Sequence, residues 1–178
     1  MNKPIFIVET DNVCYNVAKA VTENLNKALG RNYTELEFYG DRFKSDIKEN
    51  YEDTISAVIV AARTEGIVEY RDGGLKLEET LCKHRVISTT LDMAYSTQYK
   101  IPEDLLAECD EPVVYIGTNY EMCVRMPADL KILVKFDVDH KKNRIVGNED
   151  NFYVVNTLEE VEQIVSFYTE HPEMVYFH

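Results

Sequence analysis

Short apolar runs alternate along the chain with longer stretches of helical periodicity. The apolar runs span residues 4–8, 85–90, 112–116, 130–136 and 152–155. Runs of this length bounded by polar or turn residues are typical of buried strands. Strands that alternate with helices favour parallel pairing through right-handed crossovers. The pattern predicts an α/β fold: a Rossmann-like open, mostly parallel sheet of about five strands, with helices on both faces.

Helices are predicted between the strands from the spacing of apolar residues and from capping signals. After the first strand, Val17, Val21, Leu25 and Leu29 recur at steps of four, and Gly30 ends the helix. A short helix is predicted from about Leu75 to Lys83. Near the end of the chain, Thr157-Leu158-Glu159-Glu160 forms a capping box that opens a helix, and Pro172 stops it.

Composition and charge narrow the class of protein. The 178 residues, 45% of them hydrophobic, fit one domain over residues 1–178. A formal net charge of −13 argues against nucleic acid as a partner and is compatible with a basic protein or divalent cations. The chain has no apolar run near the length of a membrane span and no signal-peptide pattern. With four scattered cysteines, we expect a cytoplasmic protein with buried thiols rather than metal ligands.

Small polar or acidic residues follow four of the predicted strands. They are Glu9-Thr10-Asp11-Asn12, Ser88-Thr89-Thr90, Gly117-Thr118-Asn119 and Asp137-Val138-Asp139. In parallel sheets, ligands bind beyond the carboxyl ends of the strands, so these residues are expected at one edge. A carboxylate there can attack phosphorus, a second can act as acid or base, and hydroxyls can hold phosphate oxygens. This chemistry is phosphoryl transfer.

Several of these segments resemble motifs of the haloacid-dehalogenase (HAD) superfamily, most closely its deoxyribonucleotidase-like members. The run Ile5-Phe6-Ile7-Val8-Glu9-Thr10-Asp11-Asn12-Val13 is similar to the first motif, an apolar strand leading into Asp-x-Asp-x-Val. The strand ending in Ser88 and Thr89 resembles the second motif, and residues 113–119 fall where the fourth should lie. The resemblance implies a small helical cap insertion over residues 31–72. It also implies a Mg²⁺ cofactor.

The resemblance assigns roles to individual residues. Glu9 and Asp11 would be the catalytic carboxyl groups, and Ser88, Thr89 and Lys100 would bind phosphate. The metal ligands would be Asp11, Asn119, Asp137 and Asp139.

The chain departs from the motifs at two carboxylates. Glu9 stands where the family nucleophile is Asp, and Gly117-Thr118 stands where the family has acidic metal ligands.

Three hypotheses on function remain open. The first is a HAD-like scaffold whose phosphoryl transfer is lost or weakened, and which serves as an acidic binding or regulatory protein. Its partner would be a basic protein or a phosphorylated small molecule. The second is an active Mg²⁺-dependent phosphatase that acts on nucleotides. The third is an unrelated Rossmann-like or flavodoxin-like domain whose acidic surface engages a basic protein. The sequence leaves the oligomeric state open.

Overall fold

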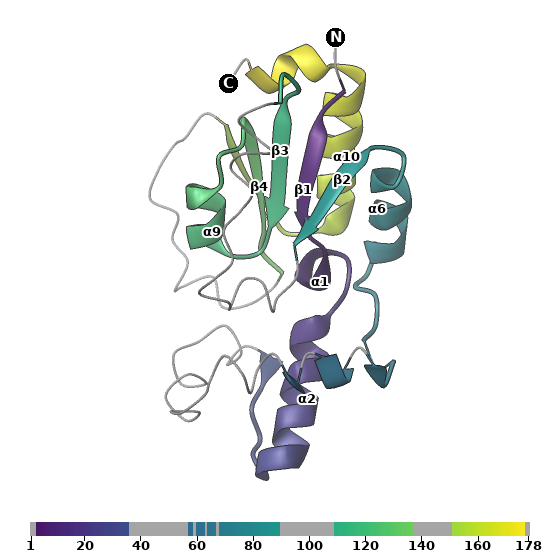
Figure 1. Cartoon of the computed structure of the whole chain (residues 1–178), viewed down its shortest axis with the longest axis vertical. Coiled ribbons are helices and arrows are strands. Elements are labelled where there is room, and N and C mark those ends of the chain that lie inside the picture. Colours follow the sequence, from purple (N-terminus) through teal and green to yellow (C-terminus); the bar gives the residue numbers. More distant parts are fainter. Residues whose placement is uncertain are drawn as a thin grey trace.

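The computed structural model describes residues 3–35, 57–58, 60–62, 64–66, 68–89, 109–136 and 151–176. These residues form a larger lobe around a β-sheet and a smaller lobe around helix α2 (Val17–Leu29), as Figure 1 shows. None of the helices in the described ranges is long and apolar enough to cross a membrane.

The sheet has five strands, all paired in parallel, in the order β2-β1-β3-β4-β5. The strands are β1 (Ile5–Glu9), β2 (Arg85–Thr89), β3 (Val113–Gly117), β4 (Leu130–Val134) and β5 (Phe152–Val155). Each begins within one residue of a run identified in the sequence, and β4 ends two residues before its run does. The predicted open, parallel α/β sheet is therefore confirmed.

Strand β1 lies in the interior of the sheet, between β2 and β3. All five of its residues are buried. Its register pairs Ile5 with Arg85 on one side and with Val113 on the other. A strand covered on both faces and both edges favours apolar side chains, which explains the apolar run Ile5–Val8 that precedes Glu9.

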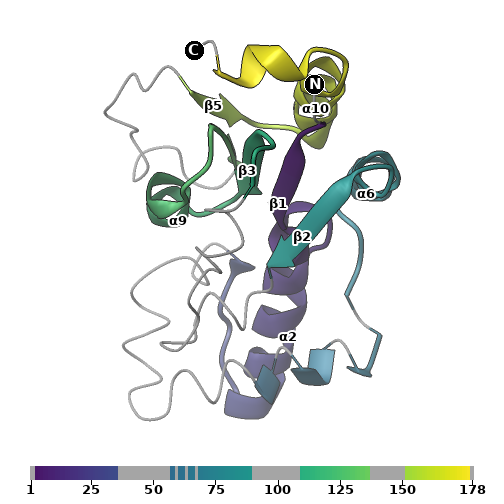
Figure 2. The same cartoon turned by 45° about the horizontal axis from the view of Figure 1, so that its top comes forward.

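Helices cover both faces of the sheet (Figure 2). Helices α6 (Gly74–Leu81) and α10 (Leu158–Glu170) bury Leu77, Val161 and Val165 in one cluster with the sheet. Helix α9 (Tyr120–Arg125) buries Cys123 in a second cluster on the other face. The two faces are filled by alternate residues of the strands, because successive side chains point to opposite sides.

The predicted capping box at the start of α10 is present. The Thr157 hydroxyl oxygen accepts a hydrogen bond from the backbone N–H of Glu160 at 3.2 Å, and the helix begins at Leu158. The Thr157 hydroxyl also donates to the Glu160 carboxylate at 3.0 Å. A short 3₁₀ helix, η1 (Pro172–Tyr176), follows α10, so the helix ends before Pro172 as expected.

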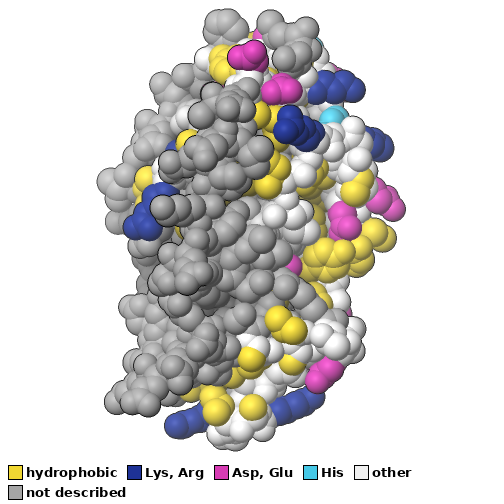
Figure 3. Space-filling view, in the orientation of Figure 1, with side chains coloured by type: hydrophobic (Ala, Val, Ile, Leu, Met, Phe, Trp, Pro, Cys, Tyr) yellow, Lys and Arg dark blue, Asp and Glu magenta, His cyan; other side chains and the backbone are white. Residues whose placement is uncertain are grey.

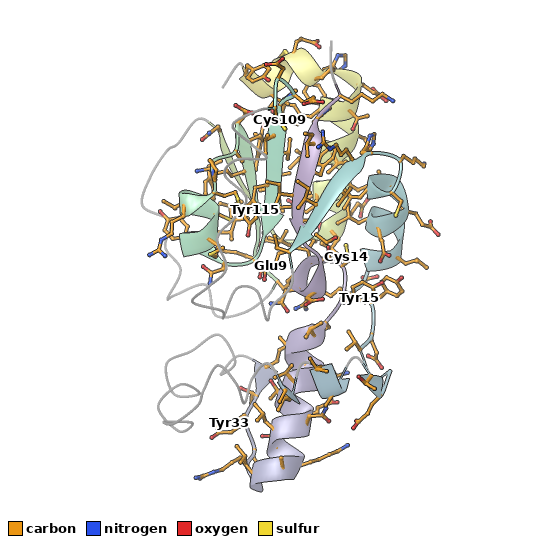
Figure 4. All side chains as sticks on the ribbon, in the orientation of Figure 1. Glu9, Cys14, Tyr15, Tyr33, Cys109 and Tyr115 are labelled. Atoms are coloured by element: carbon orange, nitrogen blue, oxygen red, sulfur yellow. The ribbon has the colours of Figure 1, made fainter. Side chains whose placement is uncertain are left out.

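The smaller lobe has its own apolar cluster. Helix α2 contributes Val17, Ala18, Val21 and Leu25, and Tyr33 packs with them. Figure 4 shows Tyr33 beside α2, away from the sheet. Helix α2 therefore lies with this lobe. Residues 36–56 of the expected cap insertion, residues 31–72, lie outside the described ranges.

Two neighbouring segments link the lobes. Residues 14–16 leave the sheet lobe, and residues 69–71 return to it. The backbone N–H of Asn16 donates to the Glu69 carbonyl at 2.8 Å, and that of Arg71 donates to the Cys14 carbonyl at 2.9 Å. The rings of Tyr15 and Tyr70 stack with centroids 4.4 Å apart. We call residues 14–16 and 69–71 the linking segments.

The four cysteines are free thiols. Cys14 and Cys123 are buried, and burial raises the pKa of the Cys14 thiol to about 12. Cys82 is exposed, so the expectation of buried thiols fails there. Cys82 is the C-cap residue of α6, directly after the buried Leu81.

Candidate functional site at the carboxyl edge of the sheet

The carboxyl ends of β1, β2 and β3 meet at one edge, as expected from the sequence. The strand order 2-1-3-4-5 reverses between β1 and β3, because the chain adds β2 on one side of β1 before it adds β3 on the other. Crevices at such reversal points are the usual ligand sites of open parallel sheets. Glu9 ends β1 there and pairs in register with Thr89 of β2.

The Glu9 carboxyl group bridges the gap between β1 and β3. The backbone N–H of Thr118 donates to Glu9 Oε2 at 2.9 Å, and the Thr118 hydroxyl donates to Oε1 at 2.9 Å. The Asn12 side-chain amide donates to the same Oε1 at 3.2 Å. Glu9 is 5% exposed. Figure 4 labels it where β1 leads into helix α1 (Thr10–Val13). Both carboxyl oxygens therefore already accept hydrogen bonds from the protein.

The surroundings of Glu9 change its acidity. Burial raises its pKa, because the charged form loses its water. The donors from Thr118 and Asn12 oppose this effect but do not overcome it, and the nearby Asp11 raises the pKa further. A carboxyl group that is protonated more readily and already hydrogen-bonded is a poor nucleophile.

The predicted phosphate-binding hydroxyls lie at the same edge. The Thr10 hydroxyl donates to Ser88 Oγ at 2.9 Å, which ties the end of β1 to β2. The Thr89 hydroxyl donates to the Val8 carbonyl at 3.4 Å and is buried. Asp11 belongs to helix α1 (Thr10–Val13) and is 8% exposed. The structure thus brings Glu9, Asp11, Ser88 and Thr89 to one edge.

Of the other predicted site residues, Asn119 lies in the described ranges and has a different role there. Asn119 caps helix α9, because its side-chain oxygen accepts the Met122 N–H at 3.2 Å. Lys100, Asp137 and Asp139 lie outside the described ranges. Within the described ranges, no group of three or more His, Cys, Asp or Glu could hold a metal ion. The described residues do not by themselves fit Mg²⁺, so the metal remains a prediction that depends on other ligands.

A cavity of about 390 Å³ lies further along the edge, near the ends of β4 and β5. Asn16, Tyr70 and Arg71 of the linking segments line it, together with Phe136 beyond β4 and Asn156 beyond β5. The Arg71 Nε donates to the Asn12 carbonyl at 2.7 Å, and its guanidinium carbon lies 3.9 Å from the centre of the Phe136 ring. Arg71 therefore connects the cavity to the edge that holds Glu9.

Sequence reasoning missed two contributors to this region. Thr118 looked like a lost metal ligand, yet it supplies two of the three donors to Glu9. Its place directly after a buried strand was a usable signal. Arg71 is not among the residues that the sequence singles out, and nothing in its local sequence shows that it reaches Asn12 and Phe136.

Five parallel strands in this order, covered by helices on both faces, define a Rossmann-like α/β fold. No protein-family model matches the chain, and no curated protein sequence matches it. Among solved structures, the protein tyrosine kinase A (PtkA) of Mycobacterium tuberculosis is similar, with a TM-score of 0.57. The similarity covers 93% of this chain and 99% of that chain at 13% sequence identity. At that identity the likeness shows the fold alone.

Proposed function

We propose that this chain is a HAD-like scaffold in which phosphoryl transfer is lost or weakened, and which works by binding. The partner is a basic protein or a phosphorylated small molecule. One observation carries the proposal: the carboxyl group at the nucleophile position is engaged by Thr118 and Asn12. To attack phosphorus, Glu9 would have to break these bonds and expose a charge that burial disfavours.

The arrangement of the strands supports the HAD-like part of the proposal. The three segments that resemble HAD motifs lie on β1, β2 and β3, which are neighbours in the sheet. An antiparallel sheet, or β1 at an edge, would have contradicted the resemblance. The similar fold of PtkA, whose name denotes a kinase, is consistent with a scaffold suited to phosphoryl groups.

Geometry also distinguishes Glu9 from an ordinary Asp nucleophile. The longer side chain places the carboxyl group about an ångström further out, and misplacement on that scale costs roughly a hundredfold in rate. In this chain the extra reach is used to bond Thr118, at the position where the family would place an acidic metal ligand. The pair thus joins β1 and β3 directly without an ion.

A second candidate, a Mg²⁺-dependent phosphatase that acts on nucleotides, is favoured by Asp11 and the Thr10–Ser88 hydroxyl pair. A carboxylate and two hydroxyls at the strand edge are suitable groups for holding a phosphate and assisting proton transfer. In that case Asp11 would take the central role and Mg²⁺ would need Asp137 or Asp139.

Hydrolysis assays separate the two candidates. With Mg²⁺, the purified protein should hydrolyse an aryl phosphate or nucleoside monophosphates barely above background. The variant Glu9→Gln should give the same low rate, which controls for a contaminating enzyme. Robust turnover that is lost in Asp11→Asn would overturn the proposal in favour of the phosphatase.

A further inference from the structure

The cavity beside the linking segments has the size and lining of a site for a small molecule. Its volume of about 390 Å³ lies within the range of roughly 300–1,000 Å³ usual for ligand pockets. Polar groups come from Asn16, Arg71, Asn156 and Thr157, a carboxylate comes from Asp72, and apolar surface comes from Tyr70, Phe136 and Leu158. It opens at the carboxyl edge of the sheet, beyond β4 and β5.

Arg71 is held in place before any ligand binds. Its side chain is 10% exposed, its Nε bonds the Asn12 carbonyl, and its guanidinium plane is packed on Phe136. Its backbone N–H bonds the Cys14 carbonyl. An arginine fixed in this way loses little conformational freedom when it pairs with an anion.

The terminal nitrogens of Arg71 make only long hydrogen bonds. Arg71 Nη1 and Nη2 each lie 3.4 Å from a single oxygen, Oε1 of Glu35. Glu35 Oε2 accepts from the Asn16 side-chain amide, also at 3.4 Å. Well-formed pairs between guanidinium and carboxylate have distances of about 2.7–2.9 Å. The Glu35 carboxylate, 31% exposed, therefore lies where an anion could pair with Arg71, but its own distances to Arg71 are too long for a well-formed pair.

We propose that this cavity binds a small molecule through a phosphate or carboxylate group that replaces Glu35 at Arg71 and Asn16. Tyr70, Phe136 and Leu158 contact a flat or apolar remainder of the ligand. This inference names a ligand for the proposed function, and it depends on that proposal because both assume that the chain works by binding. It places the ligand away from Glu9, at the ends of β4 and β5.

Three probes that share a phenyl ring test the class of ligand by calorimetric titration into the full chain. Phenylphosphonate carries a phosphate-like group that cannot be hydrolysed, benzoate carries a carboxylate, and benzamide is neutral. We expect at least one anion to bind about tenfold or more tightly than benzamide. The stronger of the two anions identifies the ligand as a phosphate or a carboxylate compound. Equal binding of all three would overturn the proposal.

Variants locate the site. Arg71→Lys loses the forked donor and should weaken binding of the preferred anion about tenfold. Glu35→Gln removes the competing carboxylate and should tighten binding about fivefold, as expected for a partly exposed ion pair. Asp72→Asn removes a negative charge from the cavity lining, where it repels the anionic ligand, and should also tighten binding of the anion.

Ser88→Ala tests the competing position beside β1 and β2, and Arg125→Lys, at an exposed arginine of α9, is the matched control that should leave the affinity unchanged. If Ser88→Ala weakens binding while Glu35→Gln and Asp72→Asn have no effect, the anion binds beside β1 and β2, and the proposal is wrong. Should Arg71→Lys fail to fold, the affinities of the Glu35 and Asp72 variants still show whether the anion binds in this cavity. Robust hydrolysis of phosphate esters would contradict the proposed function. It would not change the affinities of these variants, which test the cavity separately.

Discussion

Glu9 is a buried carboxyl group that is hydrogen-bonded across the gap between β1 and β3. Two of its three donors belong to Thr118, which is 109 residues away in the sequence, and the third belongs to Asn12. Leaving such a group without its partners costs about 1–3 kcal/mol for each unsatisfied polar atom. The raised pKa shows that burial outweighs the donors, and this makes the stability of the protein depend on pH.

Replacing Glu9 by Gln should remove that pH dependence. The folded protein holds the Glu9 proton over a pH range in which the unfolded chain has already lost it. The contribution of Glu9 to stability is therefore full below the unfolded pKa, about 4.3, and is lost as the pH rises through the raised folded value. The unfolding free energy of Glu9→Gln relative to the parent should thus increase with pH across this window.

Urea unfolding of both proteins between pH 4 and pH 8 measures this difference. Glu79→Gln, a change at an exposed carboxyl group of α6, is the control for the loss of one negative charge. If the unfolding free energy of Glu9→Gln relative to the parent falls as the pH rises, the donors and not burial dominate the pKa of Glu9.

The elements themselves could largely be predicted from the sequence. Strands β1, β3 and β4 are buried along their whole length, and apolar residues dominate each of them, with Glu9 and Lys131 as the charged exceptions. The start of α10 follows from the local capping signal at Thr157. By contrast, the Glu9–Thr118 pair and the packing of Arg71 on Phe136 join distant parts of the chain. No local pattern encodes such contacts, since they exist only once the sheet has assembled.

Helix α6 begins at a glycine that tolerates no side chain. A Cβ on Gly74 would collide with the backbone carbonyl of Cys14, in the first linking segment. Gly74→Ala should therefore destabilise the protein by about 3 kcal/mol, the upper part of the usual range for overpacking. Thermal or urea unfolding measures the loss.

Gly30→Ala is the matched control. Gly30 has a φ of 61°, but a Cβ there would meet nothing within 4 Å. Only the left-handed backbone should cost free energy, about 1 kcal/mol. Equal losses for the two variants would mean that the linking segment moves aside easily and that its contact with α6 is loose.

At the scale of the whole molecule, negative charge dominates. The net charge is −13, the Lys19–Glu69 ion pair joins two exposed side chains, and the Lys76–Glu162 pair joins an exposed lysine to a half-buried glutamate. On the face drawn in Figure 3, the Lys and Arg side chains of the described residues are scattered rather than gathered. Exposed pairs contribute about 0–1 kcal/mol each, so repulsion among the excess carboxylates should prevail.

Salt should therefore stabilise the protein. Raising NaCl from about 10 mM to about 500 mM shortens the Debye length from about 30 Å to less than 8 Å, and the melting temperature should rise by a few degrees. Calorimetry in MgCl₂ at matched ionic strength gives a second comparison. A further rise with Mg²⁺ would favour the phosphatase alternative, whereas a fall with NaCl would show that attractive pairs outweigh the repulsion.

The linking segments have a consequence for how the chain can be rearranged. Because residues 14–16 and 69–71 are hydrogen-bonded side by side, the chain leaves the sheet and comes back at nearly the same point. A short turn could join the two ends with little change in the entropy of closing the loop. The small lobe is in this sense an exchangeable module: it can be removed, shortened or replaced by another domain while the path from β1 to β2 through α6 stays intact.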